Sequence, residues 1–266
     1  MVAMQYPSRE IAGFAQNVAR QAGMQALESF RKPVPVETKA DASPVTEADR
    51  QTELFLRGAI SERFPNHAIW GEEFGGASEP DGPLWVIDPI DGTRSFITGS
   101  PLWGTLLALF DGGKVRVGVI EMPALNERWV GQKEAGSWFS DKNTAPKACR
   151  VRPCRNISEA RFYTTSPRYF TTPERGAIEQ ICDKVDIARF GGDCYSYGML
   201  ASGQIDLVVE TLLQPYDYLA LVPIIEEAGG IITDWAGAPL GLHSDGRVIA
   251  AATPDLHAAA LEMLKV

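Results

Sequence analysis

The sequence lacks clustered basic residues, and this absence limits the partners that it can bind. Among 266 residues there are 25 Lys or Arg against 34 Asp or Glu, which gives a net charge of -9. Nucleic-acid surfaces need clustered Lys and Arg, so we expect no nucleic-acid partner. An acidic protein that binds an anionic ligand must neutralise charge locally, and bound divalent cations are one way to do so.

Long apolar runs are also missing. The longest run, at residues 219–225, is interrupted by Pro223 and followed by Glu226 and Glu227, whereas a bilayer-spanning helix needs about 20 apolar residues. Residues 1–10 contain no apolar core of a signal peptide. These absences predict a cytoplasmic protein with no membrane partner.

Cysteine and histidine are scarce. No His lies near Cys149 and Cys154, which are the only two cysteines close in sequence, and a structural zinc site would need tighter Cys/His spacing. We therefore expect free thiols, as is usual in a reducing compartment. The 3 His residues share no motif with the acidic residues, so we assign them no catalytic role.

What is present is typical of a globular protein, with 45% hydrophobic and 22% charged residues. In the first half, apolar spacing predicts helices over residues 11–30 and 46–64, packed on an antiparallel sheet. The strands of that sheet are expected at residues 68–70, 84–87, 104–110, 114–121, 128–132 and 137–139.

In the second half, predicted strands and helices alternate, which favours α/β layering. A weak boundary at residues 147–153 divides the chain into an α+β half, 1–150, and an α/β half, 151–266. The expected strands are 161–165, 207–210, 230–234 and 248–252, and the expected helices are 173–185, 195–202, 218–228 and 255–264.

The motif Asp88-Pro89-Ile90-Asp91-Gly92-Thr93 carries the clearest chemical signal. An apolar strand leads into two carboxylates, and Pro89 between them fixes the backbone and cannot extend the strand ladder. We therefore place Asp88 and Asp91 on a rigid bend just past a strand end, where layered α/β folds bind ligands. Gly92 and Thr93 would open a short helix whose N–H groups can hold a phosphate. A solvated turn is the alternative interpretation.

Three further acidic residues gain meaning only in combination. Glu72, in Gly71-Glu72-Glu73, follows a short strand, while Asp49 and Asp217 lie near helix starts. Each alone is explained by a solvated surface or by helix capping. Oxygen-rich clusters drawn from separate loops are, however, what hard cations such as Mg²⁺ require.

In order and separation, these motifs resemble the inositol monophosphatase family over nearly the whole chain, about residues 11–264. The matching segments are Gly71-Glu72-Glu73, Asp88-Pro89-Ile90-Asp91-Gly92-Thr93, Tyr216-Asp217 and Glu227-Ala228-Gly229-Gly230. The resemblance implies a layered αβαβα sandwich of the inositol monophosphatase and fructose-bisphosphatase type, of mixed α+β and α/β class. It also implies a homodimer that acts on small phosphate monoesters.

The resemblance further implies a metal site for Mg²⁺, with Mn²⁺ as an alternative ion. The family's first metal position matches Glu72, Asp88 and the carbonyl of Ile90, and its second matches Asp88, Asp91 and Asp217. A third, looser ion would also use Glu72. Such metals neutralise phosphate charge and lower the pKa of a bound water, so Glu72 has a catalytic role in this scheme.

Other residues match the family's catalytic and substrate-binding positions. Thr93 paired with Asp49 matches its water-orienting pair, and Lys39 lies where the family carries a lysine in a mobile loop near the active site. The backbone amides of Gly92 and Thr93 would hold the phosphate.

Substrate choice is expected to depend on the second half. Glu210 matches the family's ligand for a substrate hydroxyl, and Asp193 stands where inositol-specific members usually have alanine. The surrounding residues resemble the histidinol-phosphate phosphatase branch, whose cationic substrate would pair with two carboxylates. For Asp193, helix capping is the structural alternative. Arg189 and Arg168 are the basic residues expected near this pocket.

Two other functions stay open at this point. An inositol or broad sugar-phosphate phosphatase would use the same metal site. A regulatory protein on the same fold would be expected to have lost at least one acidic residue of the site or Thr93, yet all are present. A dinucleotide-binding enzyme is disfavoured because no Gly-x-Gly-x-x-Gly motif follows a strand.

Overall fold

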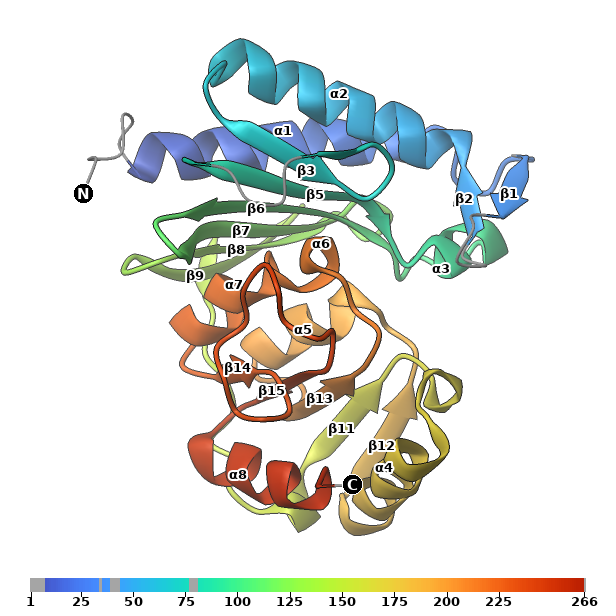
Figure 1. Cartoon of the computed structure of the whole chain (residues 1–266), viewed down its shortest axis with the longest axis vertical. Coiled ribbons are helices and arrows are strands. Elements are labelled where there is room, and N and C mark those ends of the chain that lie inside the picture. Colours follow the sequence, from blue (N-terminus) through green and yellow to red (C-terminus); the bar gives the residue numbers. More distant parts are fainter. Residues whose placement is uncertain (1–7, 34, 39–43, 77–80, 266) are drawn as a thin grey trace.

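The computed structural model describes residues 8–33, 35–38, 44–76 and 81–265. Helices and sheets alternate in layers, helix–sheet–helix–sheet–helix (Figure 1), which confirms the predicted αβαβα sandwich. Among the described residues, no helix combines the length and apolar character needed to cross a bilayer.

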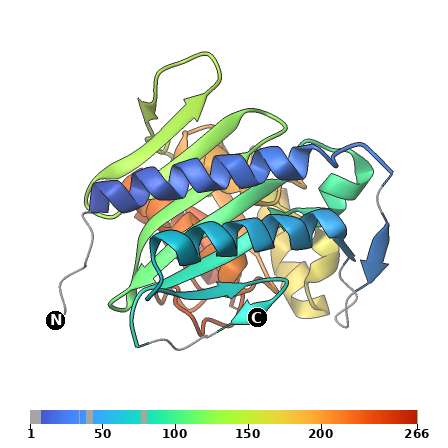
Figure 2. The ribbon, with the colours of Figure 1, turned by 90° about the horizontal axis from the view of Figure 1, so that it is seen from above.

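The outer helical layer consists of α1 (Ser8–Leu27) and α2 (Glu47–Arg63), which lie side by side across the first sheet (Figure 2). Ile11, Ala15 and Val18 of α1 are buried against this sheet, as the helical spacing of apolar residues predicted. Helix α2 starts with a capping box, in which the Thr46 backbone N–H donates to Asp49 Oδ2 at 2.8 Å.

The first sheet contains eight strands in the order β10-β9-β8-β7-β6-β5-β3-β4. Its pairs are antiparallel except for β3 and β5, which run parallel. The bounds are β3 (Ala68–Gly71), β4 (Gly75–Gly76), β5 (Leu84–Asp91), β6 (Gly104–Asp111), β7 (Lys114–Met122), β8 (Glu127–Gln132), β9 (Gly136–Asp141) and β10 (Lys147–Ala148).

The middle layer packs closely on the first sheet. It consists of α5 (Cys194–Ala201), α6 (Pro215–Tyr218) and α7 (Leu221–Glu227). A Cβ atom at Gly118 would lie 1.9 Å from the Ala220 carbonyl oxygen, and one at Gly131 would lie 2.3 Å from Ile224 N. Because these two strand positions have no side chain, α7 can approach the sheet closely.

The second sheet has the order β12-β11-β13-β15-β14, and α4 (Thr172–Lys184) and α8 (Pro254–Met263) cover its outer face (Figure 1). Its strands are β11 (Arg161–Thr164), β12 (Ile187–Phe190), β13 (Leu207–Glu210), β14 (Ile231–Thr233) and β15 (Val248–Ala251). The remaining described elements are β1 (Val36–Thr38), β2 (Pro44–Thr46), α3 (Thr93–Thr98), η1 (Ile157–Glu159) and η2 (Pro167–Tyr169).

The structure corrects several predicted elements. Strand β12 was not expected, because it lies at the edge of the second sheet with mostly exposed side chains and so shows no apolar alternation. The predicted helix 218–228 is divided into α6 and α7. Strand β5 continues to Asp91 instead of ending at residue 87, and its register with β6 shifts between Asp88 and Asp91.

Candidate metal centre and active site

The acidic residues of the first half meet because β3 and β5 are parallel. Gly71 pairs with Ile87, so Glu72 leaves β3 at the edge where β5 presents Asp88. The Glu72 backbone N–H donates to the Ile87 carbonyl at 3.1 Å. The irregular register of β5 between Asp88 and Asp91 corresponds to a bulge, and bulges re-aim side chains near functional sites.

Asp217 arrives from the other half of the chain. It is the third residue of α6, and its Oδ2 accepts the Gln214 backbone N–H at 2.6 Å. Gln214, not Asp217, is therefore the N-cap residue, which corrects the capping position expected from the sequence. One carboxylate oxygen each of Asp88, Asp91 and Asp217 lies within 4.8 Å of the others.

Burial and mutual repulsion disfavour the charged form of this cluster. Burial raises the pKa of Asp88 well above its usual range, and the charges of Glu72, Asp91 and Asp217 add to the shift. Burial and Asp91 likewise raise the pKa of Asp217. A bound cation would reverse both effects. Because carboxylates from β5 and α6 converge here, the donor set fits a hard divalent ion.

Thr93 and Asp49 come together beside this cluster, as the family resemblance implied. The Thr93 hydroxyl lies 3.4 Å from Asp49 Oδ1 and 3.1 Å from the Ile90 carbonyl oxygen. Asp49 is fully buried rather than on a solvated helix face. Burial raises its pKa, while the hydrogen bonds from Thr46 oppose that shift.

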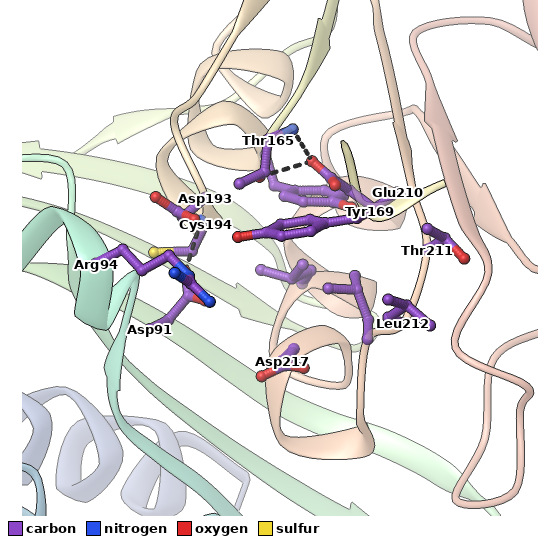
Figure 3. Close-up of a pocket in the computed structure, with 13 residues that line it drawn as sticks. Asp91, Arg94, Thr165, Tyr169, Asp193, Cys194, Glu210, Thr211, Leu212 and Asp217 are labelled. Carbon is purple, nitrogen blue, oxygen red and sulfur yellow. Dashed lines mark hydrogen bonds between the residues drawn. The ribbon is translucent and has the colours of Figure 1, made fainter. Parts of the chain in front are cut away.

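A cavity of about 400 Å³ opens beside the acidic cluster (Figure 3), a volume suited to a small ligand. Its lining includes four acidic residues, Asp91, Asp193, Glu210 and Asp217, together with apolar residues. Glu210 Oε1 accepts hydrogen bonds from the Thr165 backbone N–H at 2.7 Å and the Thr165 hydroxyl at 2.8 Å. Burial nevertheless raises the pKa of Glu210 to about 8.

Asp193 precedes α5, but its side chain makes no capping hydrogen bond to that helix. It turns instead toward the first half of the chain, where Ser95 Oγ donates to its Oδ2 at 3.1 Å. Burial and the charge of Asp91 raise the pKa of Asp193 to about 7. Asp193 is therefore the N-cap residue by position, but its side chain does not cap α5. The first N–H of α5, from Cys194, donates to Asp91 Oδ2 at 2.7 Å.

The cavity also contains residues that the sequence did not single out. Arg94 extends into it from α3, and Tyr169 contributes a ring from η2 (Figure 3). Arg94 directly follows the Asp88–Thr93 motif, and this position in the sequence could have predicted that it lies at the site. No sequence pattern marked Tyr169 and Thr165 as site residues, because they reach the cavity only through the loop that follows β11.

Two predicted substrate residues are not part of the described cavity. Arg189 is exposed on edge strand β12 and does not line the cavity, so Arg94 is the arginine found there instead. Strand β12 presents most of its side chains to solvent, which explains the difference. Lys39 lies outside the described residues.

Glu53 fixes the loop that bears Glu72. Its carboxylate is fully buried and accepts the backbone N–H groups of Glu73 at 2.7 Å and Phe74 at 3.3 Å, while Arg57 Nε donates to it at 2.7 Å. A Cβ atom at Gly71 would lie 2.0 Å from Glu53 Oε1. Gly71 is therefore required for this close approach.

We expect Gly71→Ala to lower the free energy of unfolding by about 1–3 kcal/mol, because the added methyl group overpacks a site where Glu53 cannot move freely. Urea unfolding monitored by fluorescence measures the change. Gly58→Ala in α2 is the matched control: a Cβ there meets no atom within 4 Å, so it should stabilise the helix by up to about 1 kcal/mol. Equal stability of the two variants would contradict the prediction.

The raised pKa of Glu210 predicts how stability depends on pH. Its ordinary value of 4.5 rises to about 8 in the folded protein, so between these values the folded state binds more protons than the unfolded state. Stability contributed by this group is therefore present below pH 4.5 and is lost as the pH rises toward 8, by at most about 1.4 kcal/mol per pH unit.

In urea unfolding with EDTA, the metal-free protein should accordingly be less stable at pH 8 than at pH 5.5. Glu210→Gln should reduce this difference, because the amide does not titrate. A variant with the full pH dependence of the original protein would show that other groups cause it.

Comparison with known proteins agrees with this geometry. A sequence profile of the inositol monophosphatase family matches residues 8–265. The chain therefore belongs to the inositol monophosphatase family. It is a phosphoric monoester hydrolase, and its acidic cluster fits the use of metal ions that is typical of the family.

Two relatives and one solved structure are similar to this chain over most of its length. The bifunctional phosphatase IMPL2 of Arabidopsis thaliana, a chloroplastic protein, is 41% identical over 263 residues, which cover 96% of this chain and 75% of the relative. A histidinol-phosphatase of Chlorobaculum parvum is 35% identical over 237 residues, 89% of this chain and 90% of the relative. The solved structure of an inositol monophosphatase from Zymomonas mobilis is 39% identical with a TM-score of 0.87, covering 98% of this chain and all of that one (100%).

Proposed function

We propose that this protein hydrolyses L-histidinol phosphate to L-histidinol and inorganic phosphate. The observation that supports this most directly is a pair of carboxyl groups, half-buried Asp193 and buried Glu210, which line the cavity next to the acidic cluster. A neutral polyol has no positive charge to pair with two carboxylates, whereas a ligand with an ammonium and an imidazole group can pair with both. The similarity to the histidinol-phosphatase of Chlorobaculum parvum points the same way.

In this proposal, Mg²⁺ ions, or Mn²⁺ in their place, bind at the acidic cluster. Glu72, Asp88 and the Ile90 carbonyl would hold one ion, and Asp88, Asp91 and Asp217 a second, with a looser third near Glu72. Bound metal supplies charge neutralisation for the phosphate and a lower pKa for the attacking water. The Ile90 carbonyl already accepts the Thr93 hydroxyl, which keeps this backbone oxygen directed toward the site.

The chain itself orients the reacting groups. The Thr93 hydroxyl has one hydrogen to donate, and either the Ile90 carbonyl or Asp49 can accept it. If the carbonyl held a metal ion, Thr93 would donate to Asp49 and accept a hydrogen bond from the attacking water. The backbone N–H groups of Gly92 and Thr93 would bind the phosphate oxygens. Arg94, which lines the same cavity, offers these oxygens a positive charge that the acidic cluster lacks.

The leaving group would be recognised by Asp193 and Glu210, which line the same cavity. Burial makes ionisation of Asp193 and Glu210 unfavourable, and it raises both pKa values. A cationic ligand removes that penalty and forms charge-assisted hydrogen bonds, which are about twice as strong as neutral ones. Both carboxyl groups would therefore ionise when the cationic ligand binds.

The family resemblance also supports a homodimer located in the cytoplasm as part of this proposal. Light scattering of the purified protein at two concentrations tests the dimer directly. A mass near 29.0 kDa at both concentrations would mean a monomer.

An inositol-1-phosphatase is the second candidate, because the Zymomonas mobilis structure described as an inositol monophosphatase is 39% identical over nearly the whole chain. The deciding experiment measures phosphate release from L-histidinol phosphate and from inositol 1-phosphate, with Mg²⁺ and with EDTA. A kcat/KM about 100-fold higher for histidinol phosphate, equivalent to about 2.7 kcal/mol, supports our proposal. Equal values or a preference for inositol phosphate would reject it, and full activity in EDTA would reject the metal mechanism.

A further inference from the structure

Leu212 has a backbone conformation that leucine rarely adopts. Its φ angle is +63°, in the left-handed region where a Cβ atom crowds the backbone and where glycine is favoured. Its side chain is also 66% exposed. A leucine normally gains its stability from burial, so neither the backbone nor packing within the protein accounts for leucine at this position.

The neighbouring residues explain why the backbone cannot relax. On one side, Glu210 pairs with Val248 in the second sheet. On the other side, the Leu213 backbone N–H donates to the Gly246 carbonyl at 3.0 Å, and Gln214 is held by Asp217. The short segment between β13 and α6 is thus fixed at both ends, as is usual where strained backbone persists.

This segment forms part of the cavity wall. Leu212 lies near Asp217, on the side of the view opposite Arg94 (Figure 3). Leu213, Leu221 and Tyr169 line the same cavity. An apolar wall therefore lies in a cavity that also contains four carboxyl groups, from Asp91, Asp193, Glu210 and Asp217. Leu212 is the most exposed leucine of this wall.

We propose that Leu212 is a specificity-determining residue that packs against the ring of an aromatic, cationic leaving group. This inference rests on the proposed function. An imidazole ring has apolar faces and polar edges, so it can contact Leu212 with a face while its nitrogen atoms reach carboxyl groups. A polyol has hydroxyl groups around its whole ring and would lose hydrogen bonds to water against the same wall.

Leu212→Gly tests this inference, because glycine fits the backbone and lacks the side chain. We expect the KM for L-histidinol phosphate to rise about 10-fold, as for the loss of part of a buried leucine contact. The KM for inositol 1-phosphate should change by less than about twofold. The thermal midpoint of the metal-free variant should stay level or rise by up to about 3 °C, since strain is relieved.

Two control variants separate the side chain from the strain. Leu212→Ala keeps the unfavourable φ angle, so it should raise the KM for histidinol phosphate as Leu212→Gly does without raising the thermal midpoint. Glu134, which is exposed and outside the cavity, has a φ of +65°. Glu134→Gly should match the thermal behaviour of Leu212→Gly and leave both KM values unchanged.

The outcomes are distinct. If the unmodified protein hydrolyses histidinol phosphate but neither Leu212 variant alters its KM, the role of Leu212 is overturned while the proposed function stands. Equal KM increases for both substrates would overturn specificity at this residue. If the unmodified protein hydrolyses only inositol phosphate, the proposed function fails first, and the inference about Leu212 fails with it.

Discussion

Replacing Asp88 by asparagine is expected to lower kcat by about a thousandfold or more while making the metal-free protein more stable. Asp88 is 1% exposed, and Glu72, Asp91 and Asp217 all raise its pKa. In the proposed site Asp88 would be a ligand of both ions, so its loss would remove a ligand from each. Without metal, the neutral amide relieves repulsion among carboxylates, and its oxygen can still accept the Ile90 N–H that Asp88 accepts at 3.0 Å.

Three measurements on Asp88→Asn test this prediction: phosphate release, the thermal midpoint in EDTA, and the shift of that midpoint on adding Mg²⁺. Activity and the Mg²⁺-dependent shift should disappear, while the midpoint in EDTA rises. Asp183→Asn is the matched control, because Asp183 is exposed on α4 and should leave all three unchanged. An Asp88→Asn variant that keeps the Mg²⁺-dependent shift would place the ion elsewhere.

Asp193→Asn should lower kcat/KM for L-histidinol phosphate about 100-fold and lower it far less for inositol 1-phosphate. The substitution keeps the size of the side chain, and an amide oxygen can still accept the Ser95 hydroxyl that Asp193 accepts at 3.1 Å. What it removes is a negative charge facing a cationic leaving group. A loss of about 2.7 kcal/mol is of the size expected for a charge-assisted hydrogen bond in a buried site.

Steady-state kinetics on both substrates measure this effect. Ser95→Ala offers a graded comparison, because it removes only the hydrogen bond that orients Asp193, and it should shift the same preference by a smaller factor. Equal losses on the two substrates would reduce Asp193 to a general structural role and would weaken the case for histidinol phosphate.

Local patterns predicted a large part of the fold. Residues 11–30 and 46–64 carried helical spacing, and most of the long strands had apolar runs bounded by turns. The layered sandwich itself was inferred from the family resemblance and is confirmed. Edge strand β12 was missed because a strand with exposed side chains has no alternating pattern.

The sequence by itself pointed to Asp88 and Asp91 in the acidic cluster, whereas Asp217 was added by the family resemblance and joins them only in the folded protein. Asp88 and Asp91 are three residues apart in one motif at the end of an apolar strand. Their proximity in the structure therefore follows from their spacing in the sequence. Only the tertiary structure decided in which direction the Asp193 side chain points and which residue it contacts. Its partner Ser95 is 98 residues away, and helix capping was an equally good local explanation.

The same distinction applies to Arg94, Arg189 and Leu212. Arg94 and Arg189 are both arginines, and the sequence does not show which of them lines the cavity. Arg94 does so because α3 packs beside the cavity, whereas Arg189 lies on β12 at a sheet edge. Leu212 shows no signal in the sequence, because its φ angle follows from hydrogen bonds that fix the chain on both sides. Side-chain chemistry is a local property, whereas direction and exposure depend on contacts between segments far apart in the chain, and these exist only in the folded protein.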